Sequence, residues 1–354
     1  MAMPRSCGHH ECPRCVALLL LHKCASTTLL HVLNAPIWRT TDQRLPNTRT
    51  RCGGVYYCDW MAYGANACSA SSSQPHELAD ADRAWLYFGG YLPAMAPRIA
   101  QRGCRTFALL REPVSRLLSA RAYCERPEKS RPASEGGDVL CGNTSAVGLS
   151  PAHWAAHWGP YLFRQLALEP SVYASLATSG RASPTPSHPG CATIECTSRS
   201  RFSWREQRAA FGENDDGQST RAGRSALRTL ATRMAAGKLF EVIALYEEWD
   251  ASMELLDATL PLPGGRSWHE QSKTRRQNTG RRHEKAGVDI KEQAKLDAAR
   301  RDPEVKRPIA ADRRLYVAGA SWFFALCGQH KIEAKLMKDV KALAESVGLG
   351  DAVQ

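Results

Sequence analysis

Apolar runs alternate with amphipathic segments along this chain, and the alternation predicts strands that are each followed by a helix. The runs that are short and continuously apolar, as expected of buried strands, are residues 16 to 21, 106 to 110 and 239 to 245. After each run the apolar residues recur at helical spacing. We therefore predict an α/β fold, in which a parallel sheet is flanked by helices on both faces.

The second strand leads into a well-marked helix. Pro113 suits a first helical turn, and Val114, Leu117 and Leu118 mark a buried face. Further helices are expected over residues 151 to 168, whose aromatic side chains we assign to the core, and over 224 to 234, 246 to 256, 312 to 324 and 332 to 347, with a short helix and turn over 76 to 91 that leads to residues 94 to 102. The expected organisation is a Cys/His-rich tail over residues 1 to 15 and a single domain over 16 to 347, with loop-rich insertions around 126 to 142 and 179 to 223.

A lysine and a group of hydroxyls follow the first strand. The segment consists of Lys23, Cys24, Ala25, Ser26, Thr27 and Thr28, and a helix reaching about residue 33 comes next. Unpaired amides at a helix start, together with the charge of Lys23, favour a phosphate or sulfate ester. The chain lacks the Gly-x-x-x-x-Gly-Lys-Ser/Thr string of ATPases and GTPases. A buried strand that feeds an ordinary Ser/Thr-capped helix is the alternative.

Arg111 and Ser119 form a second candidate phosphate site. Arg111 stands at the end of the second strand, and Ser119 lies about two turns into the helix after it. A guanidinium fork suits a doubly charged phosphate, and the serine hydroxyl adds a donor. A strand-to-helix turn with a surface ion pair is the alternative.

These two segments resemble the nucleotide-binding motifs of sulfotransferases. The order of Lys23 and its hydroxyls is similar to the 5′-phosphosulfate loop of the Golgi members, and Arg111 and Ser119 match the 3′-phosphate motif Arg-Asp/Glu-Pro-x-x-Arg-x-x-Ser. The resemblance is closest to the galactose 3-O- and uronyl 2-O-sulfotransferases. It implies a P-loop-like fold related to that of the nucleotide kinases, and transfer of a sulfuryl group from 3′-phosphoadenosine 5′-phosphosulfate to a glycan hydroxyl without a metal. Lys23 and Ser26 or Thr27 would then stabilise the leaving phosphate.

Later segments resemble the same enzymes in the same order. Residues 239 to 256 are similar to a strand-helix block of the family, which we assign a structural role, and residues 312 to 316 open an aromatic helix expected to end near Phe324. Between them, residues 271 to 276 resemble the basic loop that closes over the nucleotide. This loop would supply Lys273, Arg275 and Arg276.

The sequence departs from the family's pattern at the position of the general base. Uronyl 2-O-sulfotransferases carry a His-x-His pair upstream of the 3′-phosphate strand, whereas this chain has Tyr87, Phe88 and two glycines there. His31 is our first substitute as the catalytic base, because the 6-O-sulfotransferases place a histidine on that helix, and His76 is the next. A relative that binds the donor or a glycan without catalysis therefore stays open as an alternative.

The chain is strongly basic, with a formal net charge of +12 and a pI of about 9.2. Such a chain attracts polyanions, which include the nucleotide donor and an acidic glycan acceptor, although the resemblance also allows a neutral glycan. Nucleic acid is a competing partner, because basic runs occupy residues 273 to 276 and 280 to 285. The paired phosphate motifs make it the weaker reading.

Thirteen cysteines leave at least one unpaired. The local bridges we consider are Cys52 with Cys58, Cys124 with Cys141, and Cys191 with Cys196. The cysteines and histidines of residues 7 to 15 are enough for a zinc site, but a thiol-rich tail is the preferred reading. The resemblance implies the Golgi lumen, and the Asn143 glycosylation sequon agrees with it. No apolar run is long enough to span a bilayer, so any membrane association would need an N-terminal anchor that this sequence lacks, and a soluble cytoplasmic form is the alternative.

Overall fold

The computed structural model describes the chain in segments. These are residues 16–19, 21, 23–24, 29, 55–57, 86–89, 93, 96–101, 103–130, 141, 146–167, 169, 171–172, 221–261, 267–275 and 290–346. The statements that follow concern these residues. His31, His76, the other proposed cysteine pairs, the cysteines of the N-terminal tail and the Asn143 sequon lie outside them.

A parallel sheet of five strands organises the fold, in the order β2-β3-β1-β4-β5. The strands are β1 (Val16–Leu19), β2 (Val55–Tyr57), β3 (Leu86–Gly89), β4 (Arg105–Leu110) and β5 (Val242–Leu245). All of the neighbouring strands pair in parallel; Val16, for example, is in register with Leu86 on one side and with Arg105 on the other. The predicted parallel sheet is therefore confirmed.

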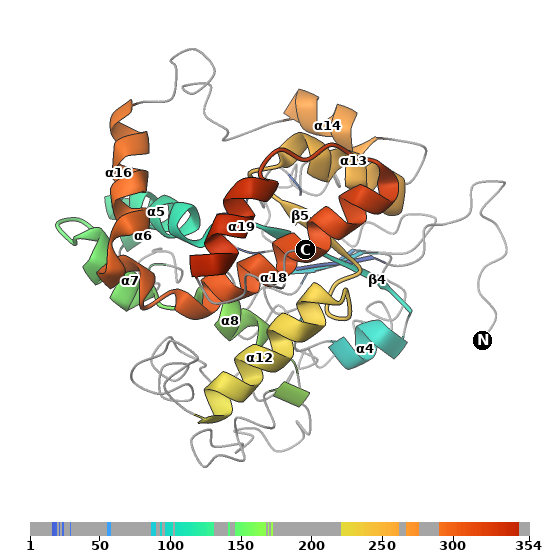
Figure 1. Cartoon of the computed structure of the whole chain (residues 1–354), viewed down its shortest axis with the longest axis horizontal. Helices are drawn as coiled ribbons and strands as arrows, with labels where there is room; N and C mark the ends of the chain where they lie inside the picture. Colours follow the sequence, from blue (N-terminus) through green and yellow to red (C-terminus); the bar gives the residue numbers. More distant parts are fainter. Residues whose placement is uncertain are drawn as a thin grey trace, which may run out of the picture.

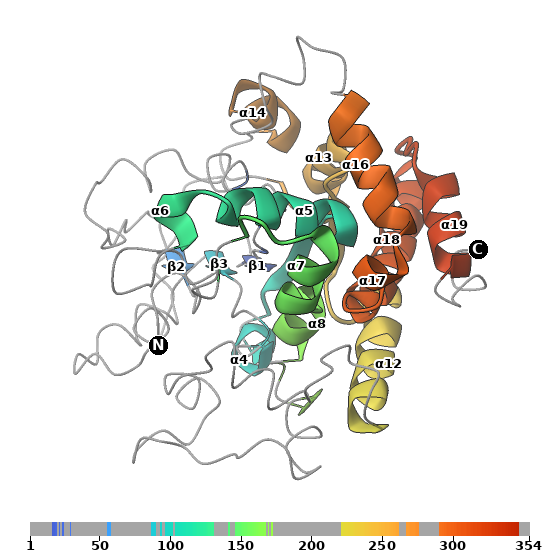
Figure 2. The same ribbon diagram turned by 90° about the vertical axis from the view of Figure 1, so that its left-hand side faces the viewer.

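Helices lie on both sides of this sheet. They are α4 (Ala96–Gln101), α5 (Pro113–Cys124), α6 (Pro127–Ser130), α7 (Pro151–Trp158), α8 (Tyr161–Leu166), α12 (Arg221–Ala235), α13 (Trp249–Thr259), α14 (Trp268–Arg275), α16 (Ile290–Arg301), α17 (Pro303–Lys306), α18 (Ala310–His330) and α19 (Met337–Ser346) (Figure 1). In Figure 2, α5 and α6 lie on one side of β1, β2 and β3, and α4 lies on the other. The alternation of strands and helices along the chain thus gives the predicted layered α/β arrangement.

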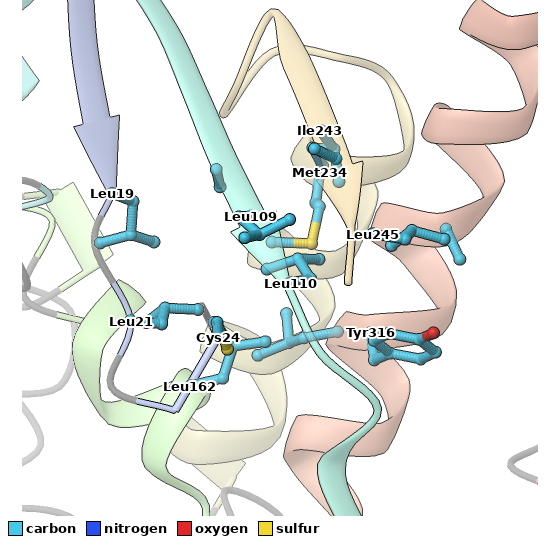
Figure 3. Close-up of a cluster of buried hydrophobic side chains, with 14 of the residues drawn as sticks. Leu19, Leu21, Cys24, Leu109, Leu110, Leu162, Met234, Ile243, Leu245 and Tyr316 are labelled. Carbon is cyan, nitrogen blue, oxygen red and sulfur yellow. The ribbon is translucent and has the colours of Figure 1, made fainter. Parts of the chain in front are cut away.

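The core forms where the sheet meets α12 and α18. The side chains of β4 from Phe107 to Leu110 and all four of β5 are buried, as expected of strands covered on both faces. Figure 3 shows Leu110, Met234 of α12 and Ile243 in one apolar cluster, with Tyr316 of α18 beside them. Gly319 allows α18 to approach closely, because a Cβ at this position would lie 2.5 Å from the Leu110 side chain.

Residues 86 to 89 correct a prediction of the sequence. They form β3, an inner strand, although a short helix and turn were predicted over 76 to 91, and β2 was not predicted at all. Periodicity does not distinguish helix from strand in runs of three or four residues. The pairing of β3 with β1 and β2 decides its conformation.

Residues 271 to 276 correct another prediction, because the expected basic loop begins inside helix α14. The carboxylate of Asp257 caps this helix by accepting hydrogen bonds from the amides of Trp268, at 2.6 Å, and His269, at 3.2 Å. The Trp268 ring is buried against Phe107, with the ring centroids 5.7 Å apart. The cap and the buried anchor together favour a helix over the loop.

The other predicted helices that lie within the described residues occur with shifted ends, whereas the helix predicted up to about residue 33 lies largely outside them. Residues 151 to 168 divide into α7 and α8 at Gly159, which has a φ of +60°, and the predicted core role of their aromatic side chains is confirmed by the burial of Trp154, Trp158 and Tyr161. Helix α18 continues to His330 instead of ending near Phe324. Helices α12 and α19 also differ from the predicted bounds at their ends.

The predicted disulfide between Cys124 and Cys141 is present and ties the end of α5 to a residue 17 positions later. Cys104 is also disulfide-bonded, whereas Cys24 and Cys327 are buried free thiols. Within the described residues, no helix has the length and apolar character that crossing a membrane requires.

A buried ion pair joins α5 to α18. Arg116 donates to the carboxylate of Asp312, and their side chains are 3% and 0% exposed. Asp312 also accepts hydrogen bonds from the amides of Leu162, at 3.0 Å, and Phe163, at 2.9 Å, at the start of α8. One carboxylate therefore holds three helices together.

Replacing Asp312 should destabilise the fold severely. In Asp312→Ala the buried guanidinium and two amides lose their acceptor, so we expect the free energy of unfolding to fall by about 3 to 5 kcal/mol. Arg116→Met should cost less, because Asp312 keeps its two backbone donors. Urea unfolding measures both. Arg307→Met, which breaks an exposed pair with Glu304, is the matched control and should cost less than about 0.5 kcal/mol. Equal losses in Asp312→Ala and Arg307→Met would contradict this account.

Candidate functional site

The chain continues toward one edge of the sheet after β1 and toward the other edge after β4. The carboxyl ends of these two neighbouring strands therefore form a topological switch point. The next strand after β1 is β2, on one side of this pair, and the next after β4 is β5, on the other. Ligands of open parallel sheets bind in the crevice at such a position. Lys23 follows β1 and Arg111 follows β4, so the two predicted anion-binding segments meet there.

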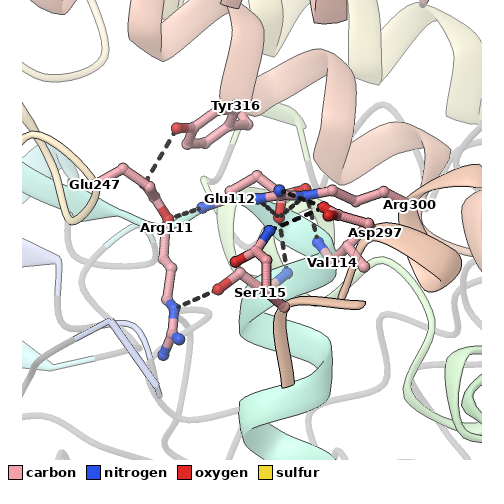
Figure 4. Close-up of polar contacts among 9 residues, drawn as sticks. Arg111, Glu112, Val114, Ser115, Glu247, Asp297, Arg300 and Tyr316 are labelled. Atoms are coloured by element: carbon pink, nitrogen blue, oxygen red, sulfur yellow. Dashed lines mark hydrogen bonds and ion pairs between the residues drawn. The ribbon is translucent and has the colours of Figure 1, made fainter. Parts of the chain in front are cut away.

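Arg111 and Lys23 are in direct contact. The Arg111 guanidinium donates from Nη1 to the carbonyl oxygen of Lys23, at 3.0 Å, and from Nε to Ser115 Oγ, at 3.2 Å. It also stacks over the Tyr246 ring at 4.5 Å from the centroid. Figure 4 shows the Arg111 side chain extended past Ser115, away from Glu247 and Tyr316. Nη2 has no hydrogen-bond partner among the described residues and is available to a ligand.

Lys23 has an unusual backbone conformation, with a φ of +64°. For a residue with a side chain this left-handed conformation is strained by about 1 to 2 kcal/mol. Strain of this kind clusters at functional sites, where the surrounding contacts over-determine it. Here the contact from Arg111 to the Lys23 carbonyl helps to hold it.

One face of α5 completes the site. Ser115, Ser119 and Tyr123 follow Arg111 at intervals of four residues, so the three side chains lie in a row along the helix. The Lys23 ammonium lies 3.1 Å from the centroid of the Tyr123 ring. Ser119 therefore lies one turn from Ser115, which contacts Arg111, and one turn from Tyr123, which contacts Lys23. The four-residue interval was visible in the sequence, but our sequence reasoning missed Ser115, Tyr123 and Tyr246 as members of the site.

The first turn of α5 is already capped. The Glu112 carboxylate accepts hydrogen bonds from the amides of Val114, at 3.0 Å, and Ser115, at 2.8 Å, and Arg300 of α16 pairs with it at 3.3 Å. These amides are therefore not free to bind an anion. At this end of the site a ligand would meet side chains, chiefly the Arg111 guanidinium.

Glu247 is a partly buried carboxylate behind Arg111. It accepts hydrogen bonds from the Glu112 amide, at 2.9 Å, and from the Tyr316 hydroxyl, at 3.1 Å (Figure 4). Burial raises the pKa of Glu247 above its ordinary value, and the neighbouring Glu112 charge adds to this. Burial also raises the pKa of Tyr316 well above its usual range, with a further contribution from Glu247. The pair joins the β4-α5 turn to α18.

Cys24 faces the protein interior. Its side chain is 1% exposed (Figure 3), and its amide donates to the Leu21 carbonyl at 3.3 Å. Burial raises the pKa of the Cys24 thiol to about 12, so the thiol is protonated and is not a nucleophile near neutral pH. This residue anchors the loop after β1 in the core.

Among the described residues, the structure does not bring the other predicted site residues together with Arg111 and Lys23. Lys273 is exposed on α14 and forms no hydrogen bond or ion pair with a described residue. The residues whose placement lies outside the description are Ala25, Ser26, Thr27, Thr28, His31, Arg276 and the side chain of Arg275. Over the described part of the chain, no group of three or more His, Cys, Asp or Glu side chains is arranged to hold a metal ion.

Comparisons with known proteins yield no relative. No protein-family model matches the chain, and neither the curated proteins nor the solved structures include a significant match.

The partly buried Glu247 should make stability depend on pH. A carboxyl whose pKa is raised on folding binds more protons in the folded state, so stability falls as pH rises from the ordinary value of 4.5 through the raised pKa. Glu247→Gln removes this titration. Its free energy of unfolding should rise relative to that of the wild type by up to about 1.4 kcal/mol per pH unit within that window. Urea unfolding of both proteins at several pH values tests this, and a difference that does not change with pH would refute it.

Proposed function

We propose that this protein is a sulfotransferase that moves a sulfuryl group from 3′-phosphoadenosine 5′-phosphosulfate to a hydroxyl of a glycan. The observation that carries the proposal is the contact between Arg111 and Lys23 at the adjoining ends of β1 and β4. The two segments that resemble the 5′- and 3′-phosphate motifs of sulfotransferases are thereby neighbours in space, although 88 residues separate them. A single nucleotide with phosphates at both ends fits such a pair.

The sheet supports a P-loop-like sulfotransferase fold as part of this proposal. Its strands are all parallel, and the two motif-bearing strands are adjacent at its centre. The later segments of the resemblance also converge on α5. Glu247 accepts hydrogen bonds from the Glu112 amide and from the Tyr316 hydroxyl, and Asp312 pairs with Arg116. In this proposal these residues position the site and do not touch the nucleotide.

The roles of the site residues follow from the charge that develops during transfer. The bond between sulfur and the leaving phosphate oxygen breaks as the bond from sulfur to the sugar oxygen forms, and the sugar hydroxyl gives its proton to a base. The Lys23 ammonium would stabilise the negative charge on the leaving oxygen. Arg111, through Nη2, and Ser119 would bind the 3′-phosphate and so orient the donor. His31 remains our proposal for the base, and Lys273, Arg275 and Arg276 for later contacts to the nucleotide.

The proposal includes a lumenal location in the Golgi. The disulfide between Cys124 and Cys141 supports it, because such bonds persist in the oxidising compartments of the secretory pathway.

Adenosine 3′,5′-bisphosphate and adenosine 5′-monophosphate together test the assignment of Arg111. Wild-type protein should bind the bisphosphate more tightly, because only this nucleotide has a 3′-phosphate. Arg111→Ala should weaken binding of the bisphosphate by about 10- to 100-fold and leave the monophosphate almost unaffected, since it removes one charged contact. Lys23→Ala should weaken binding of both nucleotides. Thermal-shift titrations and isothermal calorimetry measure these affinities.

Arg105→Ala is the matched control, because Arg105 lies at the amino end of the same strand and pairs with Glu241. It should bind both nucleotides as the wild type does. The assignment fails if the wild type does not distinguish the nucleotides or if Arg105→Ala loses as much affinity as Arg111→Ala. Transfer of labelled sulfate from the donor to desulfated glycans then separates an enzyme from an inactive relative.

Lys23→Gly and Lys23→Ala separate the backbone strain from the charge. Glycine adopts a positive φ without strain, so Lys23→Gly should be about 0.5 to 1 kcal/mol more stable than Lys23→Ala, even after the higher entropy of its unfolded chain. Both variants lack the ammonium and should lose nucleotide affinity equally. Urea unfolding gives the stability difference. A glycine variant that is less stable than the alanine variant would show that the left-handed conformation is not present in solution.

A further inference from the structure

The two hydrogen bonds of the Arg111 guanidinium do not fix its orientation completely. Nε donates to Ser115 Oγ at 3.2 Å, and Nη1 donates to the Lys23 carbonyl at 3.0 Å. Because the N–H bonds of a guanidinium lie in the plane of the group, these contacts still allow the plane to tilt about the line that joins the two acceptors. Such a tilt would redirect Nη2, the nitrogen that is available to a ligand. A third contact is needed to fix its direction.

The ring of Tyr246 supplies this third contact. The guanidinium lies over the ring with its carbon atom Cζ 4.5 Å from the centroid, a distance at which a cation and an aromatic face attract each other. The Tyr246 hydroxyl forms no hydrogen bond with a described residue, so the contact with Arg111 is made by the ring alone. A tilt toward the ring would bring the two groups into overlap, and a tilt away from it would lose the attraction.

Tyr246 is itself held in place from two directions. It directly follows β5, and its amide donates to the carbonyl of Leu110, the last residue of β4, at 2.8 Å. The Trp249 ring packs edge-on against the Tyr246 ring, with the centroids 6.3 Å apart and an angle of 70° between the planes. Trp249 is buried, and its indole N–H donates to Ser272 Oγ of α14 at 3.3 Å. The surface on which Arg111 rests is therefore formed before a ligand binds.

We propose that Tyr246 is a positioning residue, whose ring holds the Arg111 guanidinium so that Nη2 is directed at the 3′-phosphate of the nucleotide. This inference rests on the proposed function and adds to its donor site a residue outside both phosphate motifs. The preference for a nucleotide with a 3′-phosphate then depends on Tyr246 through Arg111. A ring that only packs against its neighbours would contribute to stability and leave this preference unchanged.

The ratio of the affinities for adenosine 3′,5′-bisphosphate and adenosine 5′-monophosphate tests this role by isothermal calorimetry. Tyr246→Leu removes the aromatic face, so it should weaken binding of the bisphosphate about three- to tenfold and leave the monophosphate almost unaffected. Tyr246→Phe keeps the ring and should keep the wild-type ratio. In the Arg111→Ala background, Tyr246→Leu should change the ratio less than about twofold, because the group that the ring positions is absent.

The matched control is Trp322→Leu. Trp322 is also a half-buried aromatic residue, but its indole N–H donates to the carbonyl of Glu241, directly before the amino end of β5. This variant should unfold at a lower temperature than the wild type and keep its affinity ratio. Tyr246→Gln also lacks the ring and should repeat the result of Tyr246→Leu, and it takes the place of that variant if the leucine protein does not fold.

The proposal is overturned if the ratio is unchanged without the ring, if Tyr246→Phe loses as much preference as Tyr246→Leu, or if Trp322→Leu loses it equally. A wild type that binds the two nucleotides alike would instead reject the proposed function, and this role of Tyr246 with it. A wild type that prefers the bisphosphate, together with ringless variants that prefer it to the same degree, would reject only the inference about Tyr246.

Discussion

Helix α5 depends on a buried carboxylate. Asp312 in α18 pairs with Arg116 of α5 and accepts two amides at the start of α8, all with almost no exposure to solvent. A charge buried in this way is tolerated only when its partners are fixed, and so the register between α5 and α18 is fixed as well. Glu247 also holds α5 against α18. It accepts hydrogen bonds from the Glu112 amide, just before α5, and from the Tyr316 hydroxyl, one turn after Asp312 on α18. The position of α5 relative to the sheet follows from these contacts.

Helix α5 sets the geometry of the candidate site. Arg111 precedes the helix, Ser115 and Ser119 lie along one face, and Tyr123 ends that face beside a disulfide. Lys23 contacts both ends of this row of side chains. Its carbonyl oxygen accepts a hydrogen bond from Arg111, and its ammonium lies over the Tyr123 ring. A rigid helix thus sets the spacing between two positively charged ends. This arrangement suits a ligand with two separated anionic groups better than one with a single charge.

The sequence predicted the parts of this structure that local signals determine. Strand β4 and helix α5 follow from an apolar run, Pro113 and a buried face, and the approach of Lys23 to Arg111 follows from their place after two buried strands. The parts that depend on distant contacts were missed. Strand β3 is too short for its periodicity to be decisive, and α14 depends on the Asp257 cap and on Trp268 packing against Phe107. The contact of Lys23 with Tyr123 requires a left-handed lysine, for which the sequence gives no signal.

In the proposed complex, one nucleotide bridges the loop after β1 and the start of α5. A crystal structure of the protein with adenosine 3′,5′-bisphosphate tests it most directly. We expect the 5′-phosphate beside the Lys23 ammonium and the 3′-phosphate within hydrogen-bond distance of Arg111 Nη2 and Ser119 Oγ. A nucleotide that touches neither Lys23 nor Arg111, or one whose phosphates occupy only one of these two positions, would contradict it.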